Sequence, residues 1–162
     1  MTSVYDFSIT SMEGETFGLD RFRGKVLLIV NTASKCGLAP QLKGLEDLHK
    51  KYADKGLVVI GLPSNQFRQE LDSDEAASEY CQVHYGVTFL MTKRIAVNGD
   101  ETDPLFSYLK EASGHGRIKW NYTKFLVDCT GQLIHRYAPT TTPQSFEDAV
   151  VAALANQAVT EA

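Results

Sequence analysis

The sequence predicts an α/β fold in which helices flank a mixed sheet as a three-layer sandwich. A strand, a helix and a second strand follow one another with short joints over residues 25–63. Such a βαβ unit requires a parallel strand pair with a right-handed crossover. An antiparallel hairpin is expected late in the chain, over residues 123–139. Parallel strands first, a hairpin last and helices between them are the arrangement of a thioredoxin-like fold.

The first half of the chain supplies the βαβ unit. Residues 8–24 alternate briefly around Glu13-Gly14 and predict a small opening hairpin. The run "KVLLIVNT" (25–32) is continuously apolar, which is typical of a strand buried on both faces. A helix follows, because apolar residues recur at helical spacing up to a stop at Gly56 (Leu42, Leu45, Leu48 and Tyr52). The second buried strand is "GLVVIGLP" (56–63).

The second half alternates helices with the hairpin. Residues 71–86 predict a helix with Asp72 as N-cap and Glu75 completing a capping box. Residues 103–112 predict another helix, in which Asp103 is the cap and proline takes the first position. The hairpin strands are "KFLV" and "QLIHRY", on either side of a Cys-Thr-Gly turn. A closing helix is expected over residues 142–155, beginning at Thr-Pro.

Bulk composition indicates one globular domain over residues 1–162, without repeats or linkers. The hydrophobic share is 43%, the charged share 22% and the net charge −4, so nothing favours nucleic acid or an anionic membrane as a partner. No secretory signal is visible, and no apolar run approaches the ~18 residues of a membrane span. The three cysteines show no short spacing, which argues against a disulfide scaffold and favours a reducing compartment, the cytoplasm.

Cys36 stands just beyond the first buried strand, in "NTASKCGLAP" (31–40). Sites in open α/β sheets gather beyond the carboxyl ends of the strands. A helix is expected to start close by, and the unpaired N–H groups and dipole of its N-terminus favour an anion. Lys35 and Lys43 would favour a thiolate in the same way. From position alone, a buried cysteine that acts as a small hydrophobe is an equally good interpretation.

Further polar residues are expected at the same edge of the sheet. Trp120 and Asn121 directly precede a strand that runs antiparallel to the βαβ pair, so they arrive where the parallel strands end. The segment "PSNQFRQE" (63–70) leaves the second parallel strand at that edge and carries Asn65, Gln66 and Gln69. Indole and carboxamide N–H groups are neutral donors that stabilise a thiolate or a developing oxyanion. Each residue alone is more commonly structural, and their convergence is what predicts a site.

These residues carry a resemblance to a known family. The motifs "NTASKCGL", "GLPSNQFRQE", "WNYTKFLVD" and "RYAPTTTP" resemble the glutathione peroxidase family in its cysteine form, over about residues 3 to 155. The resemblance implies a thioredoxin fold and the reduction of hydrogen peroxide and of organic or lipid hydroperoxides, without a cofactor or metal ion. It also implies a peroxidatic Cys36 served by Gln69, Trp120 and Asn121.

One motif departs from the family pattern. The family usually reads Asn-Gln-Phe-Gly-x-Gln-Glu-Pro-Gly, whereas this chain reads "NQFRQELD", one residue shorter and without Pro-Gly. Gln69 is the best match, and Gln66 stays open as an alternative. Ser64 stands where many relatives carry a cysteine, and Leu90 replaces a common proline. The assignments of Cys36, Trp120 and Asn121 do not depend on these positions.

The resemblance also suggests how oxidised Cys36 is returned. Cys81 matches the resolving cysteine of members that use thioredoxin in place of glutathione, which implies a Cys36–Cys81 disulfide. Cys81 lies on the predicted apolar face of its helix, so the helix would have to unwind, and a packing role for Cys81 is the alternative. Cys129 lies at the hairpin turn and matches no role. The chain lacks the long insertion of tetrameric relatives, and in this respect it resembles the short monomeric forms.

Other classes of protein fit the sequence less well. A dithiol oxidoreductase would carry C-x-x-C, but the residues around Cys36 read "ASKCGLA". A metal-binding module would pair its cysteines with a nearby histidine, and the four histidines have no such spacing. A peroxide sensor that passes a disulfide to a partner protein needs the same Cys36 and Cys81. Only turnover with a reductant separates that sensor from an enzyme.

Overall fold

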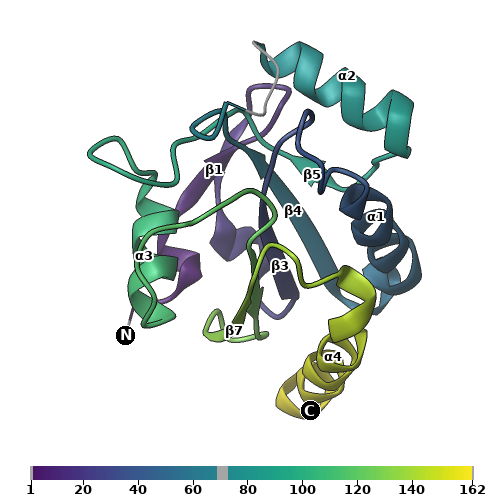
Figure 1. Cartoon of the computed structure of the whole chain (residues 1–162). Helices are drawn as coiled ribbons and strands as arrows, with labels where there is room; N and C mark the ends of the chain where they lie inside the picture. The colour runs from purple at the N-terminus through teal and green to yellow at the C-terminus, as the bar shows by residue number, and fades with distance from the viewer. Residues whose placement is uncertain (1, 69–72, 162) are drawn as a thin grey trace.

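The computed structural model describes residues 2–68 and 73–161, and Figure 1 shows their arrangement. A five-stranded mixed sheet has the order β5-β4-β3-β6-β7. Strands β3, β4 and β5 are parallel, while β6 pairs antiparallel with β3 and β7 antiparallel with β6. The bounds are Val26–Thr32 for β3, Leu57–Pro63 for β4, Leu90–Met91 for β5, Lys124–Val127 for β6 and Leu133–Tyr137 for β7. The predicted βαβ unit and the late hairpin are confirmed.

The helices cover both faces of this sheet. In Figure 1, α1 and α4 lie on one side of it and α3 on the other. The α-helices are α1 (Gln41–Tyr52), α2 (Asp74–Tyr85), α3 (Pro104–Ala112) and α4 (Glu147–Glu161). Short 3₁₀ helices are η1 (Val4–Asp6), η2 (Leu19–Phe22), η3 (Ala53–Lys55) and η4 (Pro143–Phe146). The expected opening hairpin, β1 (Ser8–Thr10) with β2 (Thr16–Gly18), forms a separate two-stranded sheet.

Strand β3 runs through the middle of the core, and all seven of its residues are buried. Leu28 and Val30 belong to the apolar cluster that also contains residues of α1 and α4. Leu27 and Ile29 face the opposite way, into the cluster with residues of α3. This two-sided burial explains why the sequence of β3 is continuously apolar rather than alternating. It also fixes where the carboxyl end of β3 emerges, which is where the site is expected.

Element boundaries follow local capping chemistry, with one correction to the predictions. The side chain of Asp103 accepts a hydrogen bond from the Leu105 N–H at 3.0 Å, so the predicted cap of α3 is confirmed. The N-cap of α2 is Ser73, which accepts from the Ala76 N–H at 3.0 Å. Ser73 takes the place of the predicted Asp72, which lies outside the described residues. The closing segment begins as a 3₁₀ turn before it continues as α4.

Strand β5 is an addition to the prediction, because its two residues are too few to show a pattern in sequence. None of the helices within residues 2–68 and 73–161 has the length and apolar character required to span a bilayer.

Candidate active site

Asn31, at the end of β3, ties the segment before β6 to the edge where the parallel strands end. Its backbone carbonyl accepts from the Tyr122 N–H at 2.7 Å, and its Oδ1 accepts from the Thr123 N–H at 3.0 Å. Its Nδ2 donates to the Trp120 carbonyl at 3.2 Å. The predicted arrival of residues 120 and 121 beside the end of β3 is therefore observed. The sequence reasoning gave Asn31 no role, although a polar residue ending an apolar strand was a visible signal.

Tyr122 extends this connection toward the cysteine. Its buried hydroxyl donates to the Ala33 carbonyl at 2.8 Å, and the Ala33 N–H approaches the same oxygen at 3.4 Å. Tyr122 has a φ of +66°, a left-handed conformation that a bulky residue rarely adopts. The ring of Tyr122 and the thiol of Cys36 belong to the same apolar cluster. Backbone strain of this kind persists where the surroundings hold it in place, often at functional sites.

The loop after β4 reaches the same edge. The Ser64 N–H donates to the Thr32 carbonyl at 3.0 Å, which continues the β3–β4 pairing beyond Pro63. The ring of Phe67 packs against the indole of Trp120, with centroids 5.3 Å apart and planes inclined by 46°. Trp120 keeps 37% of its surface exposed, so the indole stands at the rim rather than in the core.

Cys36 lies in the turn between β3 and α1 and is 5% exposed. Its Sγ accepts a hydrogen bond from the Leu38 N–H at 3.4 Å. Helix α1 begins at Gln41, with Pro40 as N-cap and no side-chain cap. The sequence predicted that the N-terminus of the following helix stabilises the thiolate. The donor observed at the sulfur is instead a backbone N–H of the turn before that helix. A backbone N–H directed at sulfur stabilises negative charge on it.

Asn121 is fully buried, and neither its Nδ2 nor its Oδ1 has a hydrogen-bond partner among the described residues. The hydroxyl of Thr32, also buried, is in the same situation. A buried polar group without a partner costs about 1–3 kcal/mol. Such groups are rare in folded proteins, and a binding or catalytic role is one of the explanations for them.

The two glutamines behave differently. Gln69 lies outside the described residues. Gln66 directs its carboxamide at the backbone of the next loop. Its Oε1 accepts from the N–H groups of Val97 at 2.6 Å and Asn98 at 2.9 Å, and its Nε2 donates to the Asn98 carbonyl at 2.8 Å. The structure thus gives Gln66 a loop-anchoring role, and all three of these carboxamide hydrogen bonds run to residues 97 and 98 rather than to Cys36.

All three cysteines are thiols in this structure. Cys81, on α2, is 1% exposed and shares the apolar cluster of Cys36, so its predicted position on the apolar face is confirmed. Cys129 lies at the β6–β7 turn, where its carbonyl accepts from the Tyr5 hydroxyl at 2.9 Å. Within the described ranges, no group of three or more potential ligand side chains could hold a metal ion.

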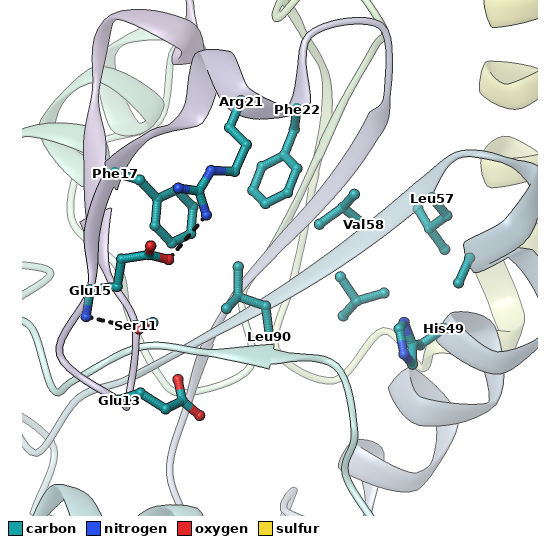
Figure 2. A pocket seen from close by; sticks show the side chains of 12 residues that line it. Ser11, Glu13, Glu15, Phe17, Arg21, Phe22, His49, Leu57, Val58 and Leu90 are labelled. Atoms are coloured by element: carbon teal, nitrogen blue, oxygen red, sulfur yellow. Dashed lines mark hydrogen bonds and ion pairs between the residues drawn. The ribbon is translucent and has the colours of Figure 1, made fainter.

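A groove of about 680 Å³ lies elsewhere, at the amino end of β4 (Figure 2). Figure 2 shows the Arg21–Glu15 ion pair and the ring of Phe17 along one wall, with Leu90 and His49 on the other side. Of the expected site residues that the structure describes, none lines it. The lining residues are Ser11, Glu13, Glu15, Phe17, Arg21, Phe22, His49, Ala53, Leu57, Val58, Val59 and Leu90.

Comparison with known proteins gives a consistent result. Residues 4–110 match the model of the glutathione peroxidase family. The chain is 50% identical over 152 residues to a glutathione peroxidase of Lactococcus lactis subsp. cremoris, covering 91% of this chain and 97% of that protein. It is 49% identical over 154 residues to glutathione peroxidase-like peroxiredoxin 2 of Saccharomyces cerevisiae, covering 92% and 95%. The crystal structure of T. cruzi GPX1 is similar with a TM-score of 0.77 at 28% identity, covering 95% and 97%.

Proposed function

Since this chain belongs to the glutathione peroxidase family and is a thiol peroxidase, we propose that Cys36 is its peroxidatic residue. The observation that carries this assignment is the convergence of three segments at the carboxyl edge of β3. There the turn holding Cys36, the loop holding Phe67 and the segment holding Trp120 and Asn121 meet. The unpartnered carboxamide of Asn121 supports a role in binding the reacting oxygens.

In the proposed reaction, the Cys36 thiolate attacks one oxygen of the hydroperoxide. An S–O bond forms, the O–O bond breaks, and the leaving oxygen takes up a proton and departs as water or an alcohol. The sulfur loses two electrons and becomes a sulfenic acid, while the peroxide gains them. The Leu38 N–H stabilises the thiolate before attack. Trp120, Asn121 and Gln69 are proposed to stabilise the charge that develops on the leaving oxygen.

Regeneration is proposed to proceed through Cys81. Its thiolate attacks the Cys36 sulfenic sulfur, an S–S bond forms as the S–O bond breaks, and the leaving hydroxide takes up a proton and departs as water. Thioredoxin then reduces the disulfide by exchange. A disulfide needs Cα atoms within about 7 Å, so the buried Cys81 has to be released from its helix. The packing of α2 favours such release. Of its described side chains only Ala77 and Cys81 are buried, Tyr85 packs half-buried against the core, and Val83 is 71% exposed. Opening α2 therefore uncovers few fully buried side chains.

The substrate is a hydroperoxide, and the reductant is a thiol. We propose thioredoxin rather than glutathione as that reductant, acting on a monomer in the cytoplasm. Because the resolving thiol lies within the chain, each cycle ends in an intramolecular disulfide, and one protein dithiol such as thioredoxin is sufficient to reduce it. The sensor alternative is less favoured, because the curated relatives are named as peroxidases and peroxiredoxins.

The test is a peroxidase assay on wild type, Cys36→Ser, Cys81→Ser and Cys129→Ser, each with thioredoxin and its reductase or with glutathione. Wild type and Cys129→Ser should turn over with thioredoxin, because Cys129 is a buried thiol without a proposed role. Cys36→Ser should be inactive. Cys81→Ser should consume about one equivalent of peroxide and stall as the sulfenic acid.

Other outcomes revise defined parts of the proposal. Continued turnover of Cys81→Ser would make Cys81 a packing residue and assign resolution to an external thiol. Wild type that is inactive with both reductants, but transfers a disulfide to a second protein, would favour the sensor.

A further inference from the structure

Two carboxamide side chains outside the proposed catalytic set join the loops on either side of the site. The first is Gln66, whose three hydrogen bonds run to the backbone of Val97 and Asn98. Gln66 directly precedes Phe67, the residue that packs against the indole of Trp120. The loop after β4 is therefore held by the 97–98 backbone.

The second carboxamide is Asn98, which continues the link from the other side. Its Nδ2 donates to the Ile118 carbonyl at 2.7 Å, and its Oδ1 accepts from the Ile118 N–H at 2.8 Å. Lys110 Nζ closes the network, since it donates to the Val97 carbonyl at 2.6 Å and approaches Asn98 Oδ1 at 3.3 Å. Asn98 is 6% exposed and Ile118 is fully buried, so water is a poor substitute for these bonds.

The hydrogen bonds of Gln66 and those of Asn98 share residues 97–98, so together they connect the two segments. Ile118 lies two residues before Trp120, and Gln66 lies three residues before Gln69. A chain of directed hydrogen bonds thus runs from the loop after β4, through residues 97–98, to the segment that carries Trp120 and Asn121. Hydrogen bonds fix separation and orientation together, which the tilted contact between the Phe67 and Trp120 rings alone does not.

We propose that Asn98 and Gln66 are positioning residues that set the loop after β4 and the Trp120–Asn121 segment relative to each other over Cys36. The inference rests on the proposed function, because it assumes that these segments act at Cys36. Neither residue touches the reacting atoms. Each acts through the donors that it orients, and misplacing such groups by about 1 Å can lower a rate by about a hundredfold.

The test uses Trp120, which is the one tryptophan of the chain and reports directly on the segment in question. Asn98→Ala removes both bonds to Ile118. Asn98→Asp keeps the acceptor for the Ile118 N–H and loses the donor to its carbonyl. Gln66→Ala, at an exposed residue, cuts the other end of the link with less risk to folding. The matched control is Tyr5→Phe, which removes one buried bond between η1 and the Cys129 carbonyl in the β6–β7 turn.

Three measurements are made on each folded variant. They are the emission maximum of Trp120, its quenching by acrylamide, and the second-order rate constant for oxidation of Cys36 by hydroperoxide. Asn98→Ala and Gln66→Ala should shift the emission, increase the quenching and lower the rate constant at least about tenfold. Asn98→Asp should fall between Asn98→Ala and wild type. Tyr5→Phe should lower thermal stability while all three measurements stay at the wild-type values.

The proposal is overturned if Asn98→Ala and Gln66→Ala lower the melting temperature but leave emission, quenching and rate constant unchanged. A purely structural role would give that pattern. If wild type itself fails to react with peroxide, the proposed function fails, and the fluorescence measurements alone decide. An unchanged Trp120 signal then overturns the positioning role, and a shifted one supports it.

Discussion

Lys124 is fully buried in β6, and its titration should make the stability of this protein rise with pH across the neutral range. Its Nζ donates to the carbonyls of Ala138, Pro139 and Thr141 at 3.3, 2.9 and 2.6 Å. Desolvation lowers the pKa of Lys124 from 10.5 to about 7. Lys124→Met keeps an unbranched apolar side chain at this position and removes the titrating group.

The sign and size of this change in stability with pH follow from the protons that Lys124 binds in the folded and unfolded states. Between pH 7 and 10.5 the unfolded chain holds a proton on Lys124 that the folded protein has largely released. Raising the pH through that window therefore favours the folded state. The stabilisation is complete above 10.5 and is lost as the pH falls to about 7. A shift of one pKa unit corresponds to ~1.4 kcal/mol, so wild type should gain about 2.5 kcal/mol relative to Lys124→Met between pH 6 and pH 9.

The assay is urea denaturation of both proteins at several pH values in that range, in which other titrating groups cancel in the difference. The three carbonyl oxygens oppose desolvation, because they favour the charged amine. If the difference in unfolding free energy between wild type and Lys124→Met stays constant with pH, these oxygens keep the pKa of Lys124 at its ordinary value. That result would refute the reasoning.

Three further changes test the packing and the site. Glu46→Ala removes a buried carboxylate that accepts hydrogen bonds from the backbone after α2, and should cost about 2 kcal/mol in urea denaturation; less than ~0.5 kcal/mol would contradict this. Gly131→Ala should lower the melting temperature more than Gly14→Ala. Both have positive φ, but only at Gly131 would a Cβ meet the Tyr5 ring, at 2.8 Å; equal losses would remove the clash as the cause. Asn121→Ala should leave stability within ~1 kcal/mol of wild type while the peroxide rate constant falls at least about tenfold, since its carboxamide has no partner among described residues to lose; loss of stability alone would contradict the site.

Much of the fold could be predicted because the signals were local. The continuous apolar run of β3 and the Asp103–Pro104 cap of α3 each indicate their secondary structure within a few residues. Strand β5 could not be predicted, because Leu90 and Met91 form a strand only through pairing with Ile60 and Gly61. Such pairing depends on tertiary contacts that no local pattern records.

In the site, too, some features could be predicted from the sequence and others depend on tertiary contacts. Strand direction alone was enough to bring Trp120 to the end of β3, because antiparallel pairing fixes which ends meet. The hydrogen bonds that hold its segment there come from Asn31, which binds the Trp120 carbonyl, and from Asn98, which binds Ile118, and a carboxamide in a sequence does not reveal its partner. For Gln66 the sequence left a place beside Cys36 open. The structure binds its carboxamide to a loop that lies about thirty residues further along the chain.

The shortness of β5 has a consequence for association between copies of the chain. It covers β4 only at Ile60 and Gly61, so no other described strand pairs along that side of Leu57–Val59. An uncovered sheet edge is a template on which a second molecule can add a strand, and that is the first step of aggregation. Here the edge lines the groove of Figure 2, and the charged Arg21–Glu15 pair lines the opposite side of the same groove. A strand added along Leu57–Val59 would have to enter this groove, whose lining includes both charged side chains.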